Sequence, residues 1–174
     1  MHLNNPLLYS ARFKANARRL AALFLSAIVL SAHADNIQNF DTQSFAQIKQ
    51  QYAGKAFVLS LWSIDCAPCR VELKLLGELK KREPDFPLVV ISTDPIENRE
   101  EAADILDDYG LKDIATWMFA DAFVERLRYS VDPTWHGELP RSYFFRTDNR
   151  VESHSGVLTP EQLEGFLLEI ASTK

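Results

Sequence analysis

The stretch that decides the fold covers residues 57–82, FVLSLWSIDCAPCRVELKLLGELKKR. Its first six residues, 57–62, form an apolar run with the length and composition of a buried strand. Residues 66–82 follow with a helical pattern, and this helix begins with the segment Cys66-Ala67-Pro68-Cys69. A C-x-x-C pair at the start of a helix that follows a strand indicates thiol–disulfide chemistry. The sequence therefore predicts a reactive dithiol at the end of a central strand.

The two cysteines have different expected roles, which follow from helix geometry. The first N–H groups of a helix lack intrahelical partners and form the positive end of its dipole, so a thiolate at Cys66 is stabilised. We therefore expect the pKa of Cys66 to lie below the value of roughly 8.5 for a free thiol. Cys69 lies one turn further on, close enough to form a Cys66–Cys69 disulfide, and Pro68 suits a first turn. Cys66 is the expected attacking thiol and Cys69 the resolving thiol.

Glu72 is the third candidate for catalysis, because it lies on the apolar side of the same helix. At 100° per residue, six residues form one broad apolar face: Cys69, Val71, Leu73, Leu75, Leu76 and Leu79. Glu72 falls inside this face, between Leu76 and Leu79. Burial disfavours the charged form of a carboxylate, which suits a proton acceptor for Cys69. The alternative is a glutamate at the edge of the face that reaches water.

The segment LWSIDCAPCRVEL resembles the active-site segment of the TlpA/ResA-like thiol–disulfide oxidoreductases of the thioredoxin superfamily. The matching residues are Trp62, Cys66, Pro68, Cys69, Arg70 and Glu72. The resemblance extends over about residues 41–171 and implies an α/β, thioredoxin-like fold, with a central mixed sheet flanked by helices. It also implies the proton-accepting role of Glu72. The buried acid of thioredoxin itself corresponds to Ser60 in this sequence.

Asp65 departs from the family pattern, which has an aromatic residue directly before the first cysteine. A carboxylate beside Cys66 disfavours its thiolate and opposes the helix dipole. Asp65 therefore bears on the reduction potential and on the surface that meets a partner. The expected substrate-facing residues are Trp62, Asp65, Ala67, Pro68 and Leu139. Trp62 is also expected to pack beneath the motif.

Leu139-Pro140 precedes an apolar strand, and the resemblance implies that this peptide bond is cis and faces the C-x-x-C segment. The implied role of Pro140 is to leave the preceding backbone free to pair with a substrate chain. Leu139 stands where the family often has a small or β-branched residue, a position that tunes potential and substrate release. His136 and Trp135 lie just upstream. Either one borders the site, or His136 is a solvated loop residue and Trp135 packs in a loop.

The remaining elements follow from periodicity and turn chemistry. Further strands are expected over residues 36–40, 86–91, 116–119, 142–146 and 151–155. Helices are expected after Asp41-Thr42, over residues 97–109 and 122–131, and from Pro160, where Thr159 and Gln162 form a capping box. The strand–helix–strand unit of residues 57–91 predicts a parallel strand pair.

Residues 1–34 have the features of a secretory signal peptide, which leaves residues 35–174 as the thioredoxin-like domain. Four basic side chains precede an apolar stretch over residues 20–30, and Ala32-His33-Ala34 resembles a cleavage site. The alternative is an uncleaved anchor in the inner membrane, for which the stretch is short. Without residues 1–34, 15 basic side chains remain against 24 acidic ones, a net charge of −9. This charge argues against binding of nucleic acid or anionic membranes.

The leading hypothesis is a periplasmic thiol–disulfide oxidoreductase, more specifically a reductase of protein disulfides. No cofactor and no metal is needed, and a monomer is expected. The resemblance implies a membrane-bound thiol donor and suggests cytochrome c haem-attachment or copper-site cysteines as substrates. The alternatives are a disulfide oxidase or isomerase, and a non-catalytic module that binds copper or a partner chain. A purely structural disulfide is disfavoured, because so short a loop adds little stability.

Overall fold

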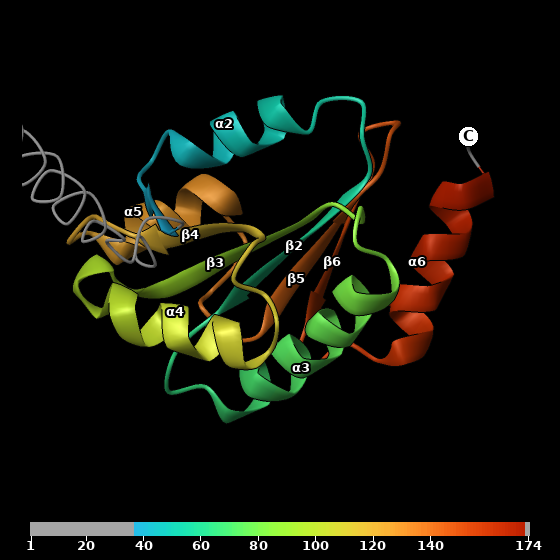
Figure 1. The fold of residues 1–174 in the computed structure, drawn as a ribbon. Coiled ribbons are helices and arrows are strands. Elements are labelled where there is room, and N and C mark those ends of the chain that lie inside the picture. Colours follow the sequence, from blue (N-terminus) through green and yellow to red (C-terminus); the bar gives the residue numbers. More distant parts are fainter. Residues whose placement is uncertain (1–36, 173–174) are drawn as a thin grey trace, which may run out of the picture. The chain divides into compact units, whose positions relative to one another are not determined.

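The computed structural model describes residues 37–172, which form a six-stranded mixed sheet (Figure 1). The strand order is β1-β4-β3-β2-β5-β6. The strands are β1 (Ile37–Phe40), β2 (Phe57–Trp62), β3 (Leu88–Pro95), β4 (Ala115–Phe119), β5 (Arg141–Phe145) and β6 (Val151–Ser155). The first four in this order are parallel, whereas β5 and β6 are antiparallel to their neighbours. The expected mixed sheet is therefore confirmed, and the expected central strand is β2.

Helices cover both faces of this sheet and bury two separate cores (Figure 1). The helices are α2 (Ser44–Gln51), α3 (Ala67–Arg82), the 3-10 turn η2 (Ile96–Asn98), α4 (Arg99–Asp108), α5 (Val124–Val131) and α6 (Pro160–Ser172). Residues of α3, α4 and α6 pack on one face, with Val58 and Trp62 of β2. Residues of α2 and α5 pack on the other face, with Leu59 and Leu61. The alternation along β2 thus supplies both cores.

The third strand differs from its expected position. It begins two residues later than residue 86 and continues to Pro95, beyond the expected end at residue 91. Pro87 still pairs with β2, because its carbonyl accepts a hydrogen bond of 3.1 Å from the Val58 N–H. At the far end, pairing with β4 shifts register between Ser92 and Pro95. This extension carries the polar residues 92–94 alongside the end of β2.

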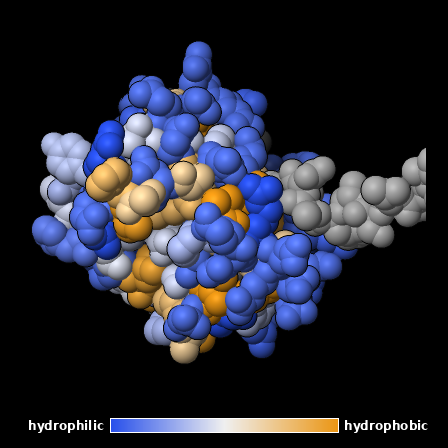
Figure 2. All heavy atoms as spheres, turned by 90° about the vertical axis from the view of Figure 1, so that its left-hand side faces the viewer, coloured by the Kyte–Doolittle hydropathy of each residue, from blue (hydrophilic) through white to orange (hydrophobic). Residues whose placement is uncertain are grey.

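Few large hydrophobic side chains are exposed among residues 37–172. On the face in Figure 2, hydrophobic residues are interrupted by hydrophilic ones. Five large hydrophobic residues are exposed in the described range: Val71, Phe123, Tyr129, Val151 and Leu168. Among residues 37–172, no helix combines the length and the apolar character that crossing a membrane requires.

Gly77 sets how closely α3 approaches the end of α4. A Cβ atom at this position would lie 2.0 Å from the carbonyl oxygen of Tyr109, so backbone would have to move. We expect Gly77→Ala to lower the free energy of unfolding by about 2–3 kcal/mol, measured by urea denaturation. Gly165→Ala in α6 is the control, because no atom lies within 4 Å of its added Cβ. It should be neutral or stabilising by up to about 1 kcal/mol, and equal effects of the two changes would contradict the packing argument.

Candidate active site

The cysteines lie where β2 turns into α3, and they form a disulfide with an S–S distance of 2.00 Å. Cys66 is the N-cap residue of α3, and its sulfur accepts a hydrogen bond of 3.2 Å from the Cys69 N–H. Cys66 is half-buried, whereas Cys69 is 0% exposed. Ala67 and Pro68, which separate them, are both exposed, and Pro68 occupies the first turn as expected. Only the first sulfur can therefore be reached from solvent.

The Leu139–Pro140 bond is cis, and it lies at the end of the sheet where β2 leads into the segment of Cys66. Arg141 of β5 pairs with Leu61 of β2 in the antiparallel register, so Pro140 lies level with the end of β2. The Pro140 carbonyl accepts a hydrogen bond of 2.9 Å from the Gly156 N–H. Pro140 is buried and Leu139 is half-buried. Segments that are far apart in the sequence thus lie at the same end of the sheet.

Glu72 is 1% exposed and accepts three hydrogen bonds from three different segments. Its Oε1 atom accepts from the hydroxyls of Ser60 on β2 and Ser142 on β5, each at 2.7 Å. Its Oε2 atom accepts from the Leu158 N–H at 3.0 Å. Both serines are also buried. Glu72 is therefore an inner residue of α3 and does not reach water in this structure.

The loop before Cys66 is held by two charged residues that the sequence did not single out for a function. Asp94 at the end of β3 accepts hydrogen bonds from the Ile64 N–H at 2.8 Å and from the Ser63 hydroxyl at 3.1 Å. Asp94 also accepts from Ser92, at 2.6 Å. From the other side, the Arg70 guanidinium donates to the Ile64 carbonyl at 3.0 Å. The sequence showed Arg70 as a match to the family motif and gave no role for it.

Three expectations from the sequence can be compared with these positions, and only that for Val71 is wrong outright. Trp62 is 0% exposed, so it packs beneath the motif and does not belong to the substrate-facing surface. Val71 is 59% exposed and lies off the apolar face of α3, because that face is narrower than a helical wheel suggests. Trp135 is buried, and its indole N–H donates to the Glu138 carbonyl at 2.9 Å, so it is loop packing. Asp65 and His136 are both exposed.

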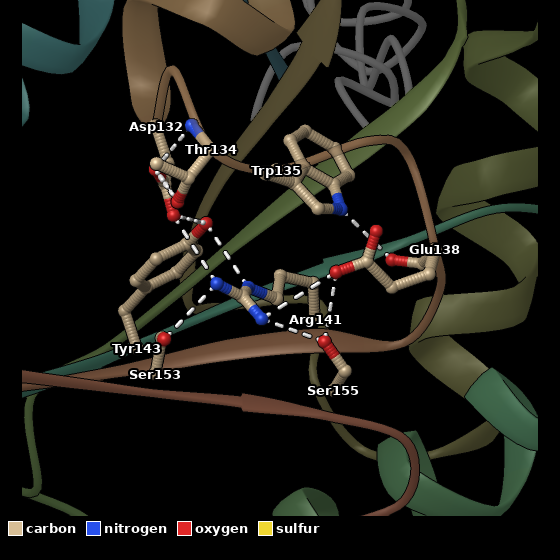
Figure 3. A network of polar contacts seen from close by, with 8 residues as sticks. All are labelled: Asp132, Thr134, Trp135, Glu138, Arg141, Tyr143, Ser153 and Ser155. Carbon is tan, nitrogen blue, oxygen red and sulfur yellow. Dashed lines mark hydrogen bonds and ion pairs between the residues drawn. The ribbon is translucent and has the colours of Figure 1, made fainter.

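Arg141 directly follows Pro140 and lies at the centre of a polar network (Figure 3). Its guanidinium donates to the carboxylate of Asp132 at 3.1 Å and to the Tyr143 hydroxyl at 3.1 Å. It also donates to hydroxyls on β6, those of Ser153 at 3.0 Å and Ser155 at 2.6 Å. Burial raises the pKa of Tyr143. The network fixes the loop of residues 132–138 against the strand that follows Pro140.

The same network makes stability depend on pH through Asp132. Burial tends to raise the pKa of this carboxylate, but hydrogen bonds from Thr134, Tyr143 and Arg141 together lower it. Because the pKa of Asp132 is lower in the folded state, the ionised carboxylate stabilises the fold at pH values above its unfolded pKa of about 3.9. This contribution is lost as the pH falls through the pKa of the folded state. We expect Asp132→Asn to lower the free energy of unfolding by about 1–2 kcal/mol at pH 7.

That deficit should shrink as the pH of urea denaturation is lowered from 5 toward about 2.5, because the protonated wild-type carboxyl loses the same advantage. Asp113→Asn, at an exposed position outside the network, serves as the control and should differ little from wild type at any pH. A deficit of Asp132→Asn that stays constant over this pH range would show that the charge of Asp132 contributes nothing.

In residues 37–172 there is no group of three or more His, Cys, Asp or Glu side chains placed to hold a metal ion. No family model matches the chain. It is 30% identical over 118 residues to proteins named thiol-disulfide oxidoreductase ResA from Bacillus thuringiensis and from Bacillus anthracis. Each match covers 67% of this chain and 64% of the relative, so the chain spans slightly less than two thirds of these relatives.

Solved structures show the same fold. A homologue of the protein DsbF from Corynebacterium diphtheriae has a TM-score of 0.57 at 19% identity, over 70% of this chain and 75% of that one. A secreted disulfide oxidoreductase from Mycobacterium tuberculosis has a TM-score of 0.54 at 20% identity, over 69% of this chain and 85% of that one. This fold agrees with the sequence comparison, and the 30% identity to the ResA proteins over 67% of its length identifies the chain as a ResA-like member of the thioredoxin superfamily.

Proposed function

We propose that this chain is a thiol–disulfide oxidoreductase that acts on protein disulfides through Cys66 and Cys69. The observation that carries the proposal is the C-x-x-C disulfide at the N-terminus of α3, with one half-buried and one fully buried sulfur. A reagent from solvent reaches Cys66 first, and Cys69 lies within bonding distance of it. The names of the ResA relatives support the same chemistry.

In the reductive direction, the Cys66 thiolate attacks one sulfur of a substrate disulfide. The substrate S–S bond breaks, a mixed disulfide with Cys66 forms, and the leaving sulfur departs as a thiolate that takes up a proton. The Cys69 thiolate then attacks the Cys66 sulfur, which releases the second substrate thiol. The substrate gains two electrons and two protons, and the enzyme is left with the Cys66–Cys69 disulfide. An external dithiol donor returns it to the reduced form.

Glu72 is the proposed acceptor of the Cys69 proton, and the hydrogen bonds identify the atom involved. Two serine hydroxyls occupy both acceptor sites of Oε1, whereas Oε2 accepts only the Leu158 N–H. Cys69 and Glu72 are three residues apart on α3 and therefore share a face. The remaining acceptor site of Oε2 is the one that can take the proton from the buried thiol.

Cys69→Ser tests the proposal, because it removes the resolving thiol and leaves the attacking one. We expect this variant to accumulate mixed disulfides through Cys66 when it meets extracts of exported proteins, seen as adducts that dithiothreitol removes. Cys66→Ser is the matched control and should trap nothing. The proposed function would be contradicted by two results together. Neither variant would form adducts, and no thiol would reduce the Cys66–Cys69 disulfide of the wild-type protein.

The direction of electron flow is proposed to be reduction of the substrate. Equilibration of the wild-type pair with dithiothreitol or glutathione gives its reduction potential. A value near the roughly −270 mV of thioredoxin agrees with a reductase that depends on a dedicated donor. A value near the roughly −120 mV of a strong periplasmic oxidant would instead establish the oxidase alternative.

We further propose that residues 1–34 are removed on export and that the protein acts in the periplasm. This proposal rests on the basic and apolar segments of residues 1–34, which lie outside the described residues. One solved structure with the same fold is described as a secreted protein. N-terminal sequencing of the protein from a periplasmic fraction should begin at Asp35, and recovery of the full chain with the membranes would favour the anchor.

A further inference from the structure

The exposed residues next to Cys66 in the sequence include one charged residue, and the others are uncharged. Asp65, directly before Cys66, is exposed. On the other side of Cys66 the exposed residues are Ala67, Pro68 and Val71, none of which is charged. Any disulfide that reaches the Cys66 sulfur must place its flanking groups against this surface.

The other charges near this loop are bound to the protein itself. Arg70 is half-buried, donates to the Ile64 carbonyl, and forms no ion pair with a described residue. Asp94 is half-buried and accepts from two hydroxyls and one N–H. In residues 37–172, by contrast, no hydrogen bond or ion pair involves the Asp65 carboxylate. Asp65 is therefore the charge that remains available to a substrate.

We propose that Asp65 makes Cys66 selective for disulfides flanked by cationic groups, such as cystines with a neighbouring lysine or arginine in an apolar setting. The inference rests on the proposed function and adds the substrate class. Adjacent residues keep the Asp65 carboxylate within about 10 Å of the Cys66 sulfur. A unit charge at this distance in water changes the local concentration of a charged ligand by about twofold to threefold, in opposite directions for cations and anions.

The reaction to be measured is the oxidation of the reduced Cys66–Cys69 pair by a small disulfide. The thiolate of Cys66 displaces one thiolate from a small symmetric disulfide, and Cys69 then displaces the second, so two electrons pass from the pair to the disulfide. Cystamine provides a dication and dithiodipropionate a dianion. The rates differ because the leaving thiols differ, so each protein rate is divided by the rate of dithiothreitol with the same disulfide.

The experiment measures this normalised ratio, cystamine over dithiodipropionate, for the reduced wild-type protein and two variants. Asp65→Asn removes the charge at nearly constant size. Asp113→Asn is the matched control, because Asp113 is exposed and lies far from Cys66. Asp113 precedes β4, whereas Cys66 follows the parallel strand β2, so the two residues lie at opposite ends of the strands. We expect a ratio of about four to nine for the wild type and Asp113→Asn, and a ratio of about one for Asp65→Asn. Salt at 1 M should abolish the preference.

Two results would overturn the inference without touching the proposed function. One is a wild-type ratio near one. The other is a preference that survives in Asp65→Asn, which would assign it to the net acidic charge of the chain. Failure of every disulfide to oxidise the reduced pair would instead refute the proposed function itself, so the two failures are distinguishable.

Discussion

Replacement of Cys66 by serine is expected to abolish disulfide exchange, with a loss of at least about 10³-fold in the rate with a small disulfide. A serine hydroxyl does not ionise near neutral pH, and Cys69 cannot substitute because it is 0% exposed. The reaction is followed by mixing the reduced protein with 2-hydroxyethyl disulfide and counting the remaining thiols. The fold should survive, because the lost disulfide closes only a very short loop.

Cys69→Ser provides the contrast that assigns the two roles. Its first step should proceed at a rate close to that of the wild type, because the half-buried Cys66 is unchanged. Its reaction should stop at one adduct per protein, detected by mass spectrometry. If Cys66→Ser kept its reactivity and Cys69→Ser lost it, the roles of attacking and resolving thiol would be reversed.

The parts of the fold that depend on neighbouring residues could be predicted from the sequence. The capping box is one example, because Thr159 and Gln162 exchange hydrogen bonds of 2.8 and 3.3 Å at the start of α6. The hairpin of β5 and β6 is another, with Asn149 in the left-handed conformation at its turn. Both follow from local backbone chemistry, which needs no knowledge of the tertiary fold.

The hydrogen-bond partners in the site could not be predicted, because they depend on register. Asp94 meets Ile64 only because β3 continues past residue 91 alongside β2. Ser142 reaches Glu72 because β5 pairs with β2 at Ser60 and alternate residues of both strands face α3. A polar residue within an apolar strand, as at Ser60, was the available indication of a buried partner.

The exposure of Val71 shows a limit of the helical wheel. The wheel gives the direction of each side chain but not how far the neighbouring elements extend over the helix. Val71 lies in the first turns of α3, and its 59% exposure shows that no described element covers it. The same wheel placed Glu72 correctly on the inner side, where the sheet does cover the helix.

Glu72→Gln is expected to slow the resolving step by about 10²-fold or more near neutral pH. The amide oxygen of glutamine can still accept from Ser60 and Ser142, so the side chain should keep its place. The amide nitrogen then replaces Oε2, and it has no acceptor site for a proton from Cys69. Attack by Cys66 on a disulfide should change little, because the change affects the buried thiol. Mixed disulfides should therefore accumulate in this variant and then decay slowly.

The pH dependence separates loss of a base from structural damage. Without a proton acceptor, resolution requires the thiolate of Cys69 to form by loss of its proton to solvent, so the rate should rise about tenfold per pH unit. The wild type should show a weaker dependence around neutral pH. Single-turnover measurements of mixed-disulfide decay between pH 6 and about 9 test this. Glu78→Gln, at an exposed position of the same helix, should follow the wild type.

Stability provides an independent check on the same carboxylate. In Glu72→Gln the amide nitrogen faces the Leu158 N–H, so two donors meet and one buried hydrogen bond is lost. This should lower the free energy of unfolding by about 1–3 kcal/mol. Ser142→Ala removes a donor to Oε1 but leaves Oε2 intact, so it should cost stability without the steep pH dependence. If both variants showed the same pH profile, Glu72 would serve the structure alone and another group would accept the proton of Cys69.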